Sequence, residues 1–211
     1  MSELELLLPE IKTSGNLASM QLPDVGDYNY WNFFNNRIIC IDGELEDWDY
    51  NVVKSIIQFN FADNGIPKEE RKPIILLIDS NGGLLTTMFS IIDAVACSIT
   101  PVWTVNMGEA LSAASLIFLA GERRFATKNS WCMTHPGSGG IQGNFTETQE
   151  QSKVWNEQVK NMGAYIVART GLDEKVWKKY KNKDWWLNSN QQIEFGFATE
   201  ILENIDDLWR G

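Results

Sequence analysis

The chain has 211 residues, of which 44% are apolar, so it is long enough to bury the core of one globular domain. Its formal net charge of −10 disfavours nucleic-acid binding, which usually needs a basic surface. No segment reaches the roughly 18 apolar residues that a membrane span requires, and the acidic start "MSELELLLPE" is unlike a signal peptide. We therefore expect a cytoplasmic protein that binds neither membranes nor nucleic acid.

The residues that usually bind metals are few and dispersed. There is a single histidine, His135, and the three cysteines Cys40, Cys97 and Cys132 include no CxxC pair. We expect no metal and no cofactor. Because the cysteines lie in apolar surroundings, we interpret them as buried free thiols.

The first part of the chain is predicted to change from an arm to regular structure. Residues 1–27 mix leucine with Pro, Gly, Ser and Asn without a sustained period, which predicts a flexible or conditionally ordered arm. The β-branched run "RIICIDG" (37–43) predicts a strand. The apolar spacing over 46–65 predicts a helix that ends at Gly65.

Strands and helices alternate in the middle of the chain. The continuous apolar runs at 73–79 and 101–108 are typical of strands covered on both faces. Helices are predicted over 80–98 and 112–121. This alternation indicates βα units and a mostly parallel sheet, which is an α/β fold.

The last third is predicted to be mainly helical. After the short strands "RRFAT" and "WCMTH", a long helix is predicted over 144–170, with Thr146 as its N-cap and Gly171 at its end. A shorter helix is predicted over 173–181.

Ser112 and Ser115 lie where a predicted strand gives way to a helix. Ligands collect at the carboxyl ends of parallel strands, and a serine at a helix N-terminus is close to the positive end of the helix dipole. Either serine can therefore be a nucleophile, although small residues at a helix start also serve as packing contacts. The GxSxG motif of the hydrolase elbow is absent.

Three other positions could supply catalytic groups. The glycines of "DSNGG" (79–83) let backbone N–H groups approach a substrate, as an oxyanion hole requires, or they form an ordinary turn. His135 precedes a glycine loop, where a general base can work, although a lone histidine is more often incidental. Asp184 lies beside two tryptophans, which suits a carboxylate that orients a histidine, or it is simply exposed.

The order and spacing of these blocks are more specific than any block alone. "DSNGG", "GEALSAASLIFLAG", "MTHPGSGGIQG" and "KDWWLNSNQQIEFGFATEIL" resemble NSPGG, GxAxSMGxxLLxxG, MIHQPxGGxQG and RDxFMSxxEAxxYGLxDxxL of the ClpP family, the peptidase subunits of Clp proteases. The resemblance runs from about Tyr28 to Leu202, which is most of the chain.

The resemblance implies a catalytic triad of Ser112, His135 and Asp184. The family's nucleophile comes four residues after the first glycine of its block and nine before the last, a spacing that selects Ser112 over Ser115. The oxyanion donors carry over as the N–H groups of Gly83 and Ala113. The implied substrate-binding residues are Gly82, Gly139, Gly140 and Ile141.

The resemblance also implies a fold, an assembly and partners. Residues 28–211 would form a crotonase-like spiral of βα units with a protruding handle helix at about 145–170. Family members form heptameric rings that stack through their handles, so a heptamer or double heptamer, a partner AAA+ Clp-type unfoldase and unfolded polypeptide substrates are implied. The apolar residues of the handle that fit burial between rings are Val154, Val159, Met162 and Ile166.

The chain departs from the family pattern in several places. Asn81 replaces a proline, Ala113 and Ala114 replace Met-Gly, and Lys183 replaces an arginine that the family uses between rings. The expected activity is that of an ATP-dependent serine endopeptidase, whose partner uses the ATP because this chain has no P-loop. Two alternatives stay open: a non-catalytic ring subunit of the ClpR type, and a crotonase-type acyl-CoA enzyme. The intact triad argues against the first, and its spacing argues against the second.

Overall fold

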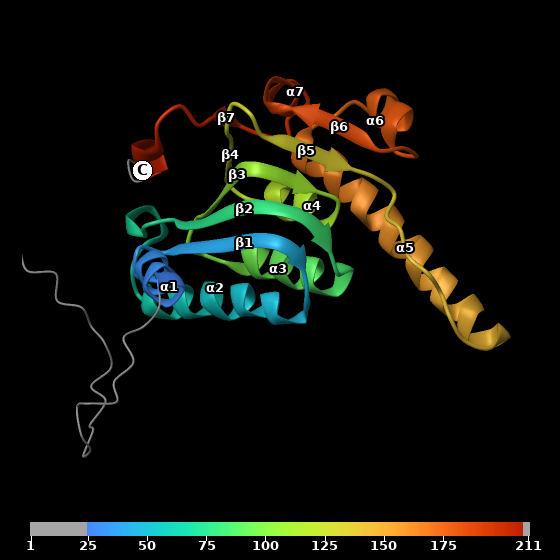
Figure 1. The fold of residues 1–211 in the computed structure, drawn as a ribbon, viewed down its shortest axis with the longest axis horizontal. Helices are drawn as coiled ribbons and strands as arrows, with labels where there is room; N and C mark the ends of the chain where they lie inside the picture. Colours follow the sequence, from blue (N-terminus) through green and yellow to red (C-terminus); the bar gives the residue numbers. More distant parts are fainter. Residues whose placement is uncertain (1–24, 209–211) are drawn as a thin grey trace, which may run out of the picture.

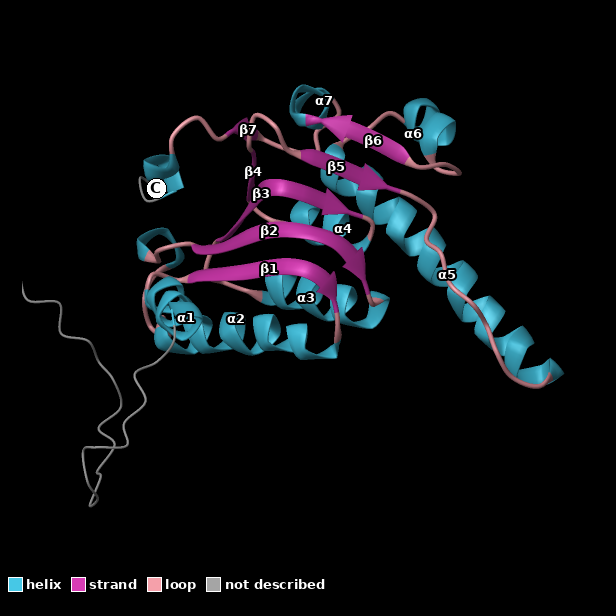
Figure 2. Cartoon of the chain, in the orientation of Figure 1, coloured by secondary structure: helices cyan, strands magenta, loops and turns pink. Residues whose placement is uncertain are grey.

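The computed structural model describes residues 25–208, which form a seven-stranded sheet with helices packed against it (Figures 1 and 2). The strands are β1 (Ile38–Leu45), β2 (Ile74–Gly83), β3 (Val102–Leu111), β4 (Arg123–Ala126), β5 (Trp131–Thr134), β6 (Trp185–Asn188) and β7 (Glu200–Ile201). The α-helices are α1 (Val25–Asn35), α2 (Tyr50–Ala62), α3 (Leu85–Cys97), α4 (Ala113–Ala120), α5 (Phe145–Thr170), α6 (Glu174–Tyr180) and α7 (Ser189–Glu194). Short 3-10 turns occur at Asp47–Asp49, Lys68–Glu70 and Ile205–Leu208.

The sheet is parallel except at one edge. Strands β1, β2, β3, β4 and β7 are neighbours in that order, and each adjacent pair is parallel. The carboxyl half of β3 pairs with β5, which in turn pairs with β6 in antiparallel fashion. Helices α2, α3 and α4 connect successive parallel strands, so the α/β fold predicted from the alternating pattern is confirmed.

The two faces of the sheet are covered differently. Helices α2, α3 and α4 lie against one face, where they enclose the larger apolar core (Figure 1). The other face carries a smaller cluster around Trp103, Val105 and Phe125, onto which Leu202 and Leu208 of the C-terminal segment pack. Farther along this second face Met107 and Trp131 are exposed, so part of the sheet has no cover from the described residues.

Most predicted elements are present, with shifted ends. The predicted arm extended to residue 27, but α1 already begins at Val25, and the remainder of the arm lies outside the described residues. The helix predicted over 46–65 is a 3-10 turn followed by α2. The strand predicted over 101–108 runs three residues farther, to Leu111, so that β3 ends directly before Ser112.

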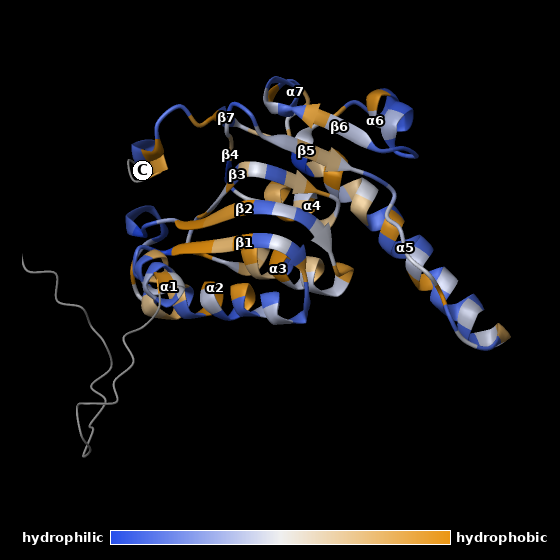
Figure 3. Cartoon of the chain, in the orientation of Figure 1, coloured by the Kyte–Doolittle hydropathy of each residue, from blue (hydrophilic) through white to orange (hydrophobic). Residues whose placement is uncertain are grey.

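The long predicted helix is α5, which projects away from the sheet (Figure 1). Its N-cap is Asn144 rather than Thr146, because the Asn144 side chain accepts a hydrogen bond from the Glu147 N–H in a capping box. Gly171 ends the helix in the left-handed conformation, as predicted. Mostly hydrophilic residues occupy the projecting half (Figure 3). No helix within the described part of the chain is both long and apolar enough to cross a membrane.

The apolar residues predicted for the handle do not share one environment. Val154 is 57% exposed, whereas Met162 and Ile166 are 5% and 2% exposed and belong to the core of this chain. The sequence prediction that all of them are available for burial between rings is therefore wrong for Met162 and Ile166. They lie at the base of α5, where the helix packs onto α4.

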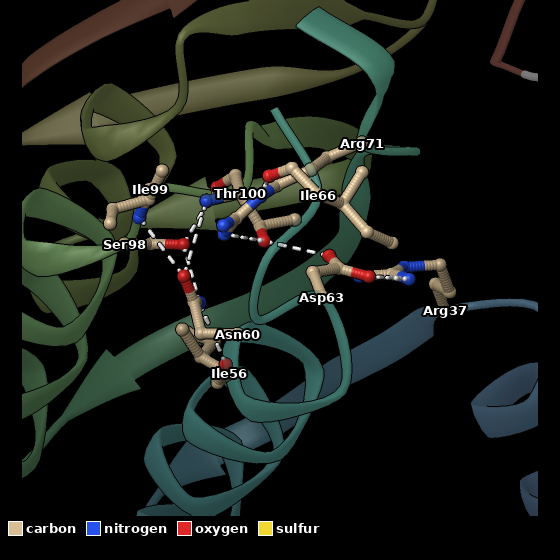
Figure 4. A network of polar contacts seen from close by, with 9 residues as sticks. All are labelled: Arg37, Ile56, Asn60, Asp63, Ile66, Arg71, Ser98, Ile99 and Thr100. Carbon is tan, nitrogen blue, oxygen red and sulfur yellow. Dashed lines mark hydrogen bonds and ion pairs between the residues drawn. The ribbon is translucent and has the colours of Figure 1, made fainter. Parts of the chain in front are cut away.

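A polar network ties the end of α2 to the amino ends of two strands (Figure 4). Asp63 accepts two hydrogen bonds from Arg37, at 2.9 and 2.6 Å, and one from the Thr100 hydroxyl at 2.7 Å. The Asn60 side chain accepts from the backbone N–H groups of Ile99 and Thr100. This network lies at the end of the sheet opposite to Ser112, and it links the residues that precede β1 and β3 to the end of α2.

Candidate active site

Ser112 occupies a sharp junction between β3 and α4. Its backbone has φ 53° and ψ −123°, a region that side chains other than glycine rarely adopt. The Ser112 N–H donates a hydrogen bond of 2.7 Å to the Met133 carbonyl of β5, which holds the junction in place. The chain thus forms a strand-to-helix elbow without the GxSxG motif. Sequence reasoning missed this geometry.

His135 is brought to Ser112 by the pairing of β5 with the end of β3. Leu111 pairs with Met133, so His135 leaves the sheet beside the elbow. The Ser112 Oγ and His135 Nε2 atoms are 2.6 Å apart, and both residues are half-buried. A hydroxyl in hydrogen-bond contact with an imidazole is the arrangement that allows removal of the serine proton.

Ser115 has a structural role. Its side chain is fully buried, and its hydroxyl donates a hydrogen bond of 2.6 Å to the Ser112 carbonyl. The structure therefore brings only Ser112, of the two serines, to the histidine. This agrees with the spacing that selected Ser112.

Asp184 lies near His135 because β5 and β6 are paired, but the two side chains form no hydrogen bond. The last antiparallel pair of β5 and β6 is Thr134 with Trp185, so His135 directly follows this pair on one segment and Asp184 directly precedes it on the other. Asp184 is exposed, and its carboxylate forms no hydrogen bond or ion pair with any described residue. The structure joins the serine and the histidine, and it leaves the predicted third member of the triad unconnected.

The glycines of "DSNGG" pack against the elbow. Gly82 has φ +95°, and a Cβ placed there would lie 2.7 Å from both the Leu111 carbonyl oxygen and the Ser112 Cβ. The same Cβ would lie 3.0 Å from the Ala113 nitrogen, at the start of α4. Gly83 has φ +151° and packs against Leu45 of β1. Gly82, a predicted substrate-binding residue, therefore lies against Ser112 and leaves no room for a side chain, whereas Gly83, a predicted oxyanion donor, packs against β1.

The segment after His135 runs alongside the projecting part of the handle (Figure 2). It contains the predicted substrate-binding residues Gly139, Gly140 and Ile141, all exposed and in no strand. A Cβ at Gly139 would lie 3.1 Å from the Trp155 ring of α5, whereas one at Gly140 would meet nothing within 4 Å. An exposed backbone that belongs to no strand is able to pair with another chain.

A cavity of about 580 Å³ opens next to His135, between α5 and α6. Its lining includes His135 and Pro136 from the glycine segment, Val159 and Met162 from α5, and Trp177 from α6. Apolar residues share the lining with polar ones, among them Asn156, Lys160 and Lys181. A cavity of this size is able to take one large side chain.

The cysteines differ from their predicted environment. Cys132 is buried, and burial raises the pKa of its thiol strongly, which makes it unreactive. Cys40 and Cys97 are exposed, so the sequence interpretation of all three as buried is wrong for these two. Cys40 is displayed on the open face of the sheet, and Cys97 is the last residue of α3, where neither side chain reaches the core. Within residues 25–208, no group of three or more His, Cys, Asp and Glu side chains could hold a metal ion.

A serine on a strand-to-helix elbow of an α/β sheet and a histidine in contact with it form the central pair of many serine hydrolases. The Clp protease family matches this chain over residues 25–205, and the chain belongs to that family. This confirms the resemblance drawn from the sequence blocks.

Individual relatives agree with this assignment. The chain is 33% identical to the ATP-dependent Clp protease proteolytic subunit 2 of Treponema denticola, over 83% of this chain and 86% of that protein. It is 28% identical to the subunit of the same name from Treponema pallidum, over 83% of this chain and 87% of that protein. Among solved structures, a point mutant of ClpP1 from Listeria monocytogenes is similar with a TM-score of 0.72 and 25% identity, covering 85% of this chain and 99% of that one.

Proposed function

We propose that this chain is an active serine endopeptidase that cleaves unfolded polypeptides inside a ring-shaped chamber. The observation that carries the proposal is the Ser112 Oγ to His135 Nε2 contact of 2.6 Å at a strained elbow. Membership of the Clp protease family makes a peptide bond the expected substrate.

In the first chemical step Ser112 attacks the carbonyl carbon of the peptide bond. His135 Nε2 takes the hydroxyl proton as the new bond from Oγ to carbon forms, and the carbonyl oxygen becomes an oxyanion. The N–H groups of Gly83 and Ala113 are the proposed donors to that oxyanion, and removal of one such donor typically costs about 10² to 10³ in rate. The histidine then gives its proton to the leaving amine, and water hydrolyses the acyl-enzyme by the same steps in reverse.

Asp184 is the proposed orienting carboxylate. With Nε2 engaged by Ser112, the other ring nitrogen, Nδ1, is the atom that a carboxylate would have to contact. The pairing of Thr134 with Trp185 supports this role, because His135 and Asp184 are the next residues on the two segments, and a local rearrangement of the segment before β6 would close the triad. We assign that rearrangement to assembly or partner binding, as a shift between two populated states.

Substrate binding is assigned to the exposed segment after His135. An extended peptide would pair with the backbone around Gly139, Gly140 and Ile141, and one of its side chains would enter the cavity between α5 and α6. Gly82, packed against Ser112, would line the approach to the reacting carbonyl.

Surface features of the described residues support a ring. Ile57 and Phe61 of α2 are 59% and 81% exposed, on the opposite side of the molecule from the uncovered sheet face with Met107 and Trp131. Two different apolar surfaces on one chain favour a head-to-tail contact, and such contacts form a ring when the rotation between neighbours closes. We propose a heptamer or double heptamer that receives substrates from a Clp-type unfoldase.

A non-catalytic ring subunit is the second candidate, and the unconnected Asp184 carboxylate favours it. Labelling with a fluorophosphonate, followed by intact-mass measurement and peptide mapping, distinguishes the two. One adduct located on Ser112 supports the peptidase. The absence of any adduct, with and without a Clp-type ATPase, would support the non-catalytic subunit.

A further inference from the structure

The C-terminal end of α4, the helix that begins after Ser112, is capped by an arginine from the handle. The last carbonyl groups of a helix have no partner within it, and those of α4 are inside the protein. Arg169, in the last turn of α5, donates from Nε to the Leu119 carbonyl at 2.7 Å and from Nη2 to the Ala120 and Gly121 carbonyls at 3.2 and 2.6 Å. Its positive charge also complements the negative end of the helix dipole.

A second arginine completes the same cluster. Arg124 is 8% exposed and donates to the Gly121 carbonyl at 3.3 Å and to the Arg169 carbonyl at 3.5 Å. Neither arginine forms an ion pair within the part of the chain that the structure describes. Two positive charges are therefore directed at backbone carbonyls rather than at carboxylates, and they join the base of the handle to α4.

The other restraints on α4 do not duplicate this contact. At its C-terminal end the Thr104 hydroxyl holds the Phe118 carbonyl at 2.6 Å, and Arg124 also reaches Gly121. The side-chain bonds to the Leu119 and Ala120 carbonyls come from Arg169 alone among the described residues. Without Arg169, two carbonyls at the end of this eight-residue helix lose their side-chain donor.

We propose that Arg169 is a positioning residue for Ser112, a role that rests on the proposed function. It fixes α4 along its axis, and α4 carries the Ser112 elbow and the Ala113 N–H at its other end. A two-turn helix transmits a displacement with little loss, and a misplacement near 1 Å can cost on the order of 10² in rate. Movement of the handle would thereby displace Ser112.

The test compares Arg169→Met, which removes the hydrogen-bond donors, with Arg169→Lys, which keeps the positive charge but has fewer hydrogen-bond donors. Arg37→Gln is the control, because it breaks another half-buried arginine contact at the far end of the sheet. Each variant is labelled with a fluorophosphonate over a range of probe concentrations, well below its melting temperature. Hydrogen exchange of the amides of 113–121 is measured in parallel.

We expect Arg169→Met to lower the maximal labelling rate by about 10- to 100-fold, while the half-saturating probe concentration changes by less than about 3-fold. Arg169→Lys should recover part of the rate, and exchange in 113–121 should accelerate in Arg169→Met only. Arg37→Gln should label at the wild-type rate even though it melts earlier. Wild-type labelling in Arg169→Met, or an equal loss in Arg37→Gln, would overturn the proposal.

The failure of the proposed function gives a different result. A wild-type protein that takes no label, with or without a Clp-type ATPase, would refute the peptidase, and hydrogen exchange would then decide the positioning role. Faster exchange of 113–121 in Arg169→Met, and not in Arg37→Gln, would still support the restraint of α4 by Arg169. Unchanged exchange would overturn it.

Discussion

Ser112 and Ser115 provide a matched pair for testing the nucleophile. We expect Ser112→Ala to abolish fluorophosphonate labelling and peptidase activity with little change in melting temperature, because among the described residues its hydroxyl bonds only to His135. Ser115→Ala removes a buried hydrogen bond to the Ser112 carbonyl, which typically costs about 1 kcal/mol of stability. It should still take the label. An adduct on Ser112→Ala would relocate the nucleophile.

Gly82 is a position where a single methyl group should disturb the Ser112 elbow directly. In Gly82→Ala the new Cβ would be 2.7 Å from the Ser112 Cβ. The backbone at position 82 also has φ +95°, a conformation that costs residues other than glycine about 1 to 3 kcal/mol. We expect a lower midpoint of chemical unfolding and slower labelling of the folded protein. Gly140→Ala is the control, since nothing lies within 4 Å of its Cβ and its unfolding midpoint should not change.

At the scale of elements, the Asp63 network should make stability depend on pH. Burial raises the pKa of this carboxyl, but hydrogen bonds from Arg37 and Thr100, together with the charges of Arg37 and Arg71, outweigh burial, so the pKa is lowered in the folded state. A lowered pKa stabilises the fold above the unfolded value of about 3.9, and this contribution is lost as the pH falls through the folded pKa.

The variant Asp63→Asn isolates that contribution. It leaves Arg37 without its carboxylate, and breaking a buried pair costs about 3 kcal/mol at neutral pH. The difference in unfolding free energy between wild type and variant should shrink as the pH is lowered below about 4, as measured by urea titrations at each pH. A difference that stays constant down to about pH 2 would contradict the assignment.

The base and the projecting part of α5 should respond differently to charge. Ile166→Glu places a carboxylate in the core, so we expect a loss of about 3 kcal/mol or more and little folded protein. Val154→Glu changes an exposed position, so the melting temperature of the isolated chain should be nearly unchanged. If handles join two rings, Val154→Glu should convert double rings to single rings in native mass spectrometry. Intact double rings in this variant would place the contact elsewhere.

How far the sequence predicts this structure depends on the type of interaction involved. Alternating apolar strands and helices predict the α/β sheet, because burial on both faces leaves a local pattern. The elbow at Ser112, in contrast, depends on Gly82, which is distant in the sequence and close in space. The core position of Ile166 was missed for the same kind of reason, since a helical spacing cannot distinguish packing within a chain from packing between chains.

For the whole molecule, we expect activity to depend on assembly and on an ATPase. The exposed Asp184 predicts slow cleavage of a fluorogenic dipeptide by the isolated protein and faster cleavage when a Clp-type ATPase is bound. A folded reporter should be degraded only with the ATPase and ATP, as followed by loss of its fluorescence. Rapid degradation of that reporter by this chain alone would refute the sequestered-chamber account.

The uncovered part of the sheet also affects how stability is measured. A neighbour that packs over Met107 and Trp131 binds the folded chain and not the unfolded one, so it stabilises the fold by mass action. The melting temperature of this protein then has no single value, because it rises with the protomer concentration. A subunit newly released from the ribosome has not yet bound its neighbours, so its melting temperature is the lowest. In this state proteolysis and aggregation compete with assembly.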